Sequence, residues 1–198
     1  AGTTFDAGGY APSINGYFNG NILSGHYDWS SGDQNMTFRL TSTSTGDSTY
    51  VAGKMEKNGA TGCPSGVGTN CNLGSSRQYW AAATWDATAS KILFELDLDR
   101  GAKTFRYFSA NSATTAFAYP EYFLSIVKVG TIIYGCSETN ALKKWDTSTG
   151  IVTELVIPGT AKCHGTKILY KPATGAKPNR LVFPFNQNGL HGIAEYFL

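Results

Sequence analysis

The chain has 198 residues and a net charge of +2 at neutral pH, and charged side chains make up only 15% of it. An average soluble protein carries about 25% charged residues. Aromatic residues are abundant, at 13%, which excludes a disordered chain, because disordered chains are rich in charge and poor in aromatics. This composition is typical of exported proteins built from short strands and tight turns.

The first fifteen residues are small and polar apart from Phe5 and Tyr10. They predict an N-terminal arm over 1–15 that is flexible or donates a strand to the sheet of a neighbouring subunit. A single all-β domain is expected over 16–198, because chains of this length usually bury one core. No run of 18 apolar residues occurs, so we expect no membrane span.

Short apolar or alternating runs follow the arm, separated by turn residues that include Asn15-Gly16, Asn19-Gly20 and Asn188-Gly189. Asn-Gly suits the two positive-φ positions of a tight hairpin turn. Helical periodicity is almost absent, and the best helical candidate, Ala116–Val127, is interrupted by Pro120. About a dozen short strands predict an antiparallel sandwich or barrel, with propeller-like repeated hairpins as the alternative.

One phrase occurs three times: an aromatic residue and Asp, a short polar turn, and an apolar strand that ends in Leu. Its aspartates are Asp28, Asp86 and Asp146, which are 58 and then 60 residues apart. A repeat at a near-constant spacing indicates a repeated structural unit. Because an Asp at a turn accepts hydrogen bonds from backbone N–H groups, we predict that all three aspartates hold hairpin turns.

The stretch Val127–Gly159 resembles one blade of a β-propeller. It contains a strand ending near Tyr134, a polar turn, a strand ending in Trp145-Asp146, a Thr-Ser-Thr-Gly turn and an outer strand. Propeller blades usually run about 40–50 residues, whereas the repeat here is closer to 60. Three hairpin units in one sandwich or barrel explain the same residues, so both architectures stay open.

The four cysteines are Cys63, Cys71, Cys136 and Cys163. An even, sparse count favours two disulfides in an oxidising compartment, and sequence order suggests Cys63–Cys71 and Cys136–Cys163. Free buried thiols are the alternative. We expect neither a metal nor a cofactor: the spacing lacks a C-x₂-C knuckle, and Cys163 and His164 would point to opposite faces of a strand.

Two rows of polar side chains would each share one face of a strand. They are Ser24, His26 and Asp28 in the first row and Glu95, Asp97 and Asp99 in the second. Neither row matches the order of a catalytic family, and the chain has no nucleophile elbow. We therefore expect no enzyme, with a carbohydrate-active enzyme using an acid pair as the alternative.

Aromatic side chains exceed what a core of this size needs, and exposed Tyr and Trp often stack on sugars or bind proteins. The predicted ligand-binding residues are Tyr17, Trp29, Trp80 and Tyr107. Lysines of the last third are expected on the solvent side of strands, so no nucleic-acid partner is expected.

These features together favour a secreted or surface-displayed, non-enzymatic β protein that acts in adhesion or binding, or as a subunit of an extracellular assembly. Its expected partners are other copies of itself or a cell-surface or glycan ligand. Besides the enzyme, a barrel-type carrier of a small ligand is an alternative, and it would need an enclosed apolar cavity.

Overall fold

The computed structural model describes residues 13–18, 20–28, 35–52, 83–86, 88–89, 91–97, 103–109, 112–113, 117–118, 123–159, 161–164 and 167–198. Every regular element in these ranges is a β-strand. The ladders whose register is defined are all antiparallel. The prediction of an all-β, antiparallel fold is therefore confirmed, and the described residues of the stretch considered for a helix, 117–118 and 123–127, lie in strands.

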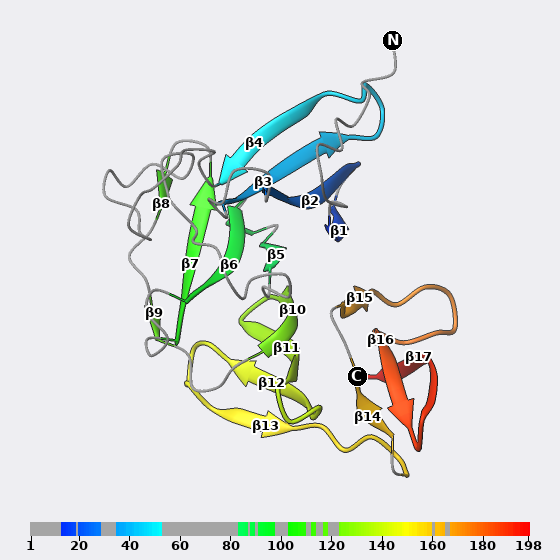
Figure 1. Ribbon diagram of the computed structural model, residues 1–198. Coiled ribbons are helices and arrows are strands. Elements are labelled where there is room, and N and C mark those ends of the chain that lie inside the picture. The colour runs from blue at the N-terminus through cyan, green and yellow to red at the C-terminus, as the bar shows by residue number, and fades with distance from the viewer. Residues whose placement is uncertain are drawn as a thin grey trace. The chain divides into compact units, whose positions relative to one another are not determined.

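The first two sheets follow the order of the chain (Figure 1). The first consists of β1 (Ser13–Phe18), β2 (Asn21–Asp28), β3 (Asn35–Ser42) and β4 (Ser48–Ala52). The second consists of β5 (Ala83–Asp86), β6 (Lys91–Asp97), β7 (Lys103–Ser109), β8 (Ser112–Ala113) and β9 (Phe117–Ala118), in which β8 and β9 both pair with β7.

The third sheet is again a meander in chain order, made of β10 (Phe123–Val129), β11 (Ile132–Ser137), β12 (Leu142–Asp146) and β13 (Val152–Glu154). The fourth contains β14 (Lys162–Cys163), β15 (Leu169–Lys171), β16 (Arg180–Gln187) and β17 (Leu190–Phe197). Antiparallel meanders of this kind also form the blades of propellers. Within the described ladders no sheet closes into a barrel.

The two shortest strands of the fourth sheet share one side of β16. β15 pairs with Arg180 to Val182 and β14 with Phe185 and Asn186, while β17 runs along the whole other side. Pro184 lies between the two short ladders. Because proline has no N–H to donate, it suits a position where a ladder is interrupted.

The described residues divide into two compact units. One contains the described residues up to Ala118 except Ala83 and Thr84, and the other contains those two and everything from Phe123 on. The predicted domain over 16–198 and the predicted arm over 1–15 stay predictions. Residues 13–15 of that arm lie in β1, and residues 1–12 lie outside the described part.

The core of the second unit joins its two sheets. Its buried residues are Val127, Cys136 and Leu142 from the third sheet, and Cys163, Ile168, Leu181 and Phe183 from β14 to β16. Burial of each large apolar side chain contributes about 1.5–3 kcal/mol. One face of each of these two sheets is therefore covered by the other sheet, as in a sandwich.

Candidate functional site

The structure describes the side chains of two of the three predicted turn aspartates, Asp86 and Asp146. Asp146 Oδ1 accepts hydrogen bonds from the backbone N–H and the hydroxyl of Ser148, at 2.9 and 2.6 Å. Asp86 Oδ1 accepts from the N–H groups of Thr88 and Ala89, at 2.9 and 3.1 Å. Both contacts have the form of an Asx turn. Asp28 is the last residue of β2, and its side chain lies outside the described part.

The hydrogen bonds from Ser148 also set the charge of Asp146. They are the main cause that holds the pKa of its carboxyl below the ordinary value. The bonds therefore favour the ionised form and strengthen as the pH rises through the carboxyl's pKa. Asp146 thus stabilises the turn that follows β12, and the preceding residue, Trp145, is buried.

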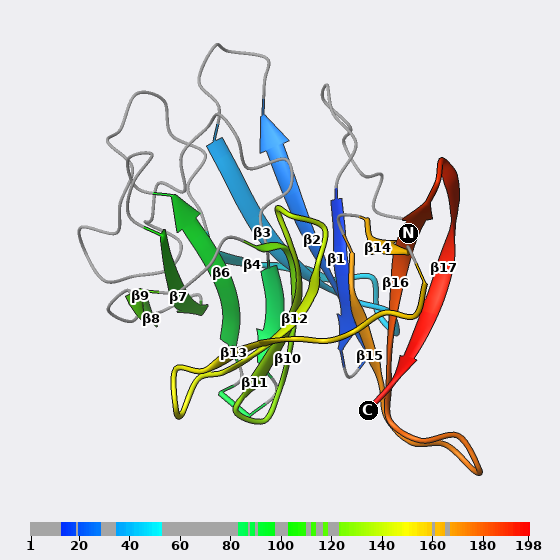
Figure 2. The ribbon, with the colours of Figure 1, turned by 90° about the horizontal axis from the view of Figure 1, so that it is seen from below.

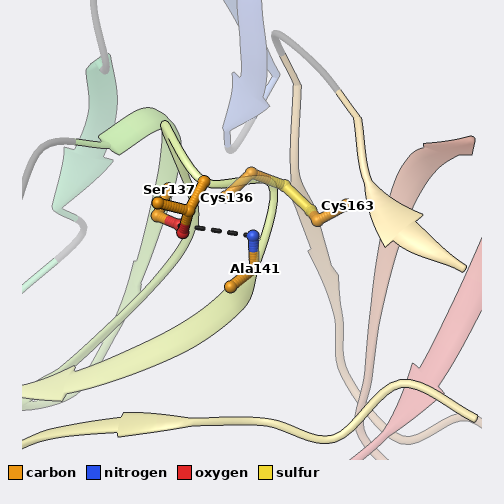
Figure 3. The surroundings of a disulfide bond; sticks show 5 residues. Cys136, Ser137, Ala141 and Cys163 are labelled. Carbon is orange, nitrogen blue, oxygen red and sulfur yellow. Dashed lines mark hydrogen bonds between the residues drawn. A yellow bond between two sulfur atoms is a disulfide. The ribbon is translucent and has the colours of Figure 1, made fainter. Parts of the chain in front are cut away.

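A disulfide joins Cys136, in β11, to Cys163, in β14, with their Cα atoms 5.6 Å apart (Figure 3). Both residues are fully buried. Beside it, the Ala141 N–H donates to Ser137 Oγ at 3.3 Å, and the Ser137 N–H donates to the Ala141 carbonyl at 2.9 Å. The bond therefore ties the third sheet to the fourth. Cys63 and Cys71 lie outside the described residues.

The predicted ligand-binding aromatics are only partly visible. Tyr17, in β1, is 65% exposed, whereas Tyr107 lies in β7 with its side chain outside the described part. Trp29 and Trp80 also lie outside it. Tyr50 is a further exposed aromatic, and the Arg39 guanidinium lies 4.1 Å from its ring centroid. A ligand-binding role for Tyr17, Trp29, Trp80 and Tyr107 therefore stays a prediction.

The two polar rows likewise remain predictions. Ser24 is buried in β2, and Glu95 lies in β6, but the side chains of most row members lie outside the described residues. Within the described ranges, no group of three or more His, Cys, Asp and Glu side chains is placed to hold a metal ion. The same ranges contain no helix long and apolar enough to cross a membrane.

The sequence reasoning missed a surface on β17, although it foresaw that strand. β17 pairs with β16 on one side, and no other strand pairs with it within the described residues (Figure 2). Its side chains alternate: Ala194 and Tyr196 pack on the core of the second unit, whereas Ile193 and Phe197 are 77% and 56% exposed. The exposed residues His191, Ile193, Glu195 and Phe197 are called the β17 row below.

Polar contacts hold the β17 row in place. Arg180, buried on β16, donates from Nε to Glu195 Oε1 at 3.1 Å. At the other end of the row, the rings of His191 and His164 meet edge to face, with centroids 5.3 Å apart. The strand itself was predicted from the sequence, but its place at a sheet edge depended on which strands pair.

Lys167, between β14 and β15, should titrate well below an ordinary lysine. Burial lowers its pKa to about 8, so that at pH 8 its neutral fraction is about 100-fold larger than that of a lysine with a pKa of 10.5. The native state then releases this proton before the unfolded state does, and the free energy of unfolding rises between pH 8 and 10.5. We expect an NMR titration of the lysine Cε resonances to show this midpoint.

A midpoint for Lys167 at the ordinary lysine value of 10.5 would contradict the prediction.

A scan against protein-family models finds none that matches this chain. A search of the curated proteins finds no match either. In the second unit, the residues of the chain that favour a binding role are those of the β17 row.

Proposed function

We propose that this protein is a secreted or surface-displayed, non-enzymatic β protein that acts as a subunit of an extracellular assembly. The observation that supports this proposal most directly is the edge strand β17, which is eight residues long and exposes Ile193 and Phe197. A long apolar edge strand is a template for pairing with another chain. Soluble proteins usually protect such an edge with lysine, proline or a bulge, and β17 contains neither lysine nor proline.

A second copy of the chain is the occupant that the residues of β17 favour. If two β17 strands pair antiparallel about a twofold axis at Ile193, each Ile193 lies opposite its equivalent, and each His191 lies opposite the Glu195 of the other copy. An apolar pair directly across two strands contributes about 0.2–1 kcal/mol, and the His191 ring can donate a hydrogen bond to the Glu195 carboxylate. Main-chain hydrogen bonds supply the rest, as in other cases of strand addition.

The disulfide supports the extracellular part of the proposal. Disulfides persist mainly in oxidising compartments, and Cys136–Cys163 ties the fourth sheet, which carries the β17 row, to the third. A low content of charged residues, 15% of the chain, is also usual for exported surface proteins. The adhesive form of the proposal uses the same surface toward a cell-surface or glycan ligand.

Sedimentation analysis of the purified chain over a range of concentrations tests the proposal. We expect reversible dimers or larger species for the wild type. Ile193→Glu places two carboxylates opposite each other at the twofold axis, so the dissociation constant should rise at least about 10-fold. Ile151→Glu is the matched control, because Ile151 is 62% exposed on the β12–β13 turn and lies outside the β17 row.

Equal weakening by Ile151→Glu and Ile193→Glu would remove β17 as the contact. A wild-type chain that stays monomeric at every concentration, and that binds neither glycan arrays nor cell surfaces, would overturn the proposed function.

A further inference from the structure

A pocket of about 290 Å³ lies in the second unit between the β11–β12 turn and the segment that follows β13. Its lining includes Asn140, Leu142, Glu154, Leu155, Ile157 and Lys162. Small-ligand pockets usually begin at about 300 Å³, so this volume suits a compact molecule. We call it the clasp pocket.

Both ends of the segment that borders the clasp pocket are fixed. The Leu155 N–H donates to the Leu142 carbonyl at 2.8 Å, and the Cys163 N–H donates to the Asn140 carbonyl at 2.9 Å. The disulfide from Cys163 to Cys136 fixes the second end covalently. Since Asn140 and Leu142, which accept these two bonds, also line the pocket, the pocket is held in shape before any ligand arrives, which lowers the entropy lost on binding.

The charged lining is balanced. Glu154 and Lys162 are both exposed, and among the described lining residues they are the only two with charged side chains. Neither has an ion pair within the described part of the chain. Lys143 lies opposite Glu154 in the β12–β13 ladder but outside the lining. The pocket thus offers one anion and one cation to a ligand that carries both charges.

The remaining lining offers an apolar contact and backbone N–H groups. Leu142 is fully buried, Leu155 and Ile157 are half-buried, and Val156 is 80% exposed. Within the described residues, the N–H groups of Val156 and Ile157 donate to no backbone carbonyl. An aliphatic side chain therefore has a surface to pack on, and a polar ligand has donors beside that surface.

We propose that the clasp pocket binds a small zwitterion with an aliphatic side chain, of the free amino acid or dipeptide type. The ligand's ammonium group pairs with Glu154, its carboxylate pairs with Lys162, and its side chain packs on Leu155 and Ile157. Charge-assisted hydrogen bonds of this kind are stronger than neutral ones. The site is independent of the β17 row and adds a ligand to the proposed function.

Other ligand classes fit the lining less well. The described lining contains no aromatic side chain, so the stacking surface that sugar sites commonly use is missing there. A phosphate would need more positive charge than one lysine accompanied by a glutamate supplies. A long acyl chain would need a larger and wholly apolar cavity.

Three related ligands test the contributions of the ammonium and the carboxylate separately. They are leucine, N-acetyl-leucine, which lacks the ammonium, and leucine amide, which lacks the carboxylate. We expect leucine to bind about 10-fold more tightly than either derivative in an NMR titration, with the largest shifts at the amides of Asn140 and Leu155. Glu154→Gln should abolish the preference of leucine over N-acetyl-leucine. Lys162→Gln should abolish its preference over leucine amide.

Glu138→Gln is the matched control, because Glu138 is an exposed acid in the β11–β12 turn that borders the pocket and lies outside the lining. It should leave all three affinities unchanged. Equal affinities for the three ligands, shifts located away from the pocket, or no binding at millimolar concentration would each overturn the proposal.

Discussion

Replacing both Cys136 and Cys163 by serine lowers the free energy of unfolding by about 3–4 kcal/mol. The bond closes a loop with a sequence separation of 27 residues, and its removal returns to the unfolded chain the conformational entropy that a loop of that length restricts. The loss should appear in urea denaturation followed by circular dichroism. Hydrogen exchange should show it first at the amides of β11 and β14.

The same substitution should affect the clasp pocket. Without the disulfide, the end of the segment at Cys163 is held to Asn140 by its backbone hydrogen bond alone. Leucine binding should therefore weaken, even at temperatures where the variant is folded. Chemical reduction of a Cys63→Ser, Cys71→Ser variant, in which Cys136 and Cys163 are the two remaining cysteines, is the control and should reproduce both effects. A Cys136→Ser, Cys163→Ser variant as stable as the wild type would show that the bond contributes little.

Replacing Gly135 by alanine should destabilise the protein by about 3 kcal/mol, at the upper end of what overpacking usually causes. Gly135 is buried in β11. A methyl group there would lie 2.4 Å from Cδ1 of Phe123 and 2.8 Å from the backbone carbonyl oxygen of Ser125. Phe123 is fully buried, and the carbonyl belongs to the paired strand β10, so neither neighbour can withdraw without opening the β10–β11 ladder.

Gly192→Ala, on β17, is the matched control for this prediction. Its methyl group would also be crowded, at 2.6 Å from Cε1 of Phe185, but the nearest atoms all belong to one half-buried ring. That ring can turn aside, so we expect a loss of about 1 kcal/mol. Thermal unfolding of the two variants compares them directly. Equal losses of stability in the two variants would show that the crowding around Gly135 does not set the cost of its replacement.

Local chemistry made the strands and several turns predictable. The Asn188-Gly189 pair connects β16 to β17, and both residues have positive φ, 52° and 82°, as an Asn-Gly hairpin turn requires. Asn15-Gly16 differs: it lies inside β1, where the ladder to β2 shifts register between Ile14 and Gly16. An Asn-Gly pair makes positive φ angles accessible to the backbone. Whether the pair forms a hairpin turn or a β-bulge depends on how the strand pairs with its neighbour.

The pairing of Cys136 with Cys163 was the arrangement suggested by sequence order, and the structure has it. The crowding at Gly135 was not predictable, because a glycine in a strand has several explanations and only the ring of Phe123 selects among them. The clasp pocket was also missed. Its walls meet through contacts such as that of Asn140 with Cys163, which no local pattern records.

The sequence by itself determined that this chain is all-β, that short apolar or alternating runs form its strands, and that Asp86 and Asp146 stand at turns. These properties follow from the period of a strand and from turn chemistry, which act over a few residues. Only the tertiary structure decided that β17 lies at an edge and that Glu154 and Lys162 share a pocket. The reason is physical: an edge or a pocket is defined by which distant segments pack together, and that depends on the whole core.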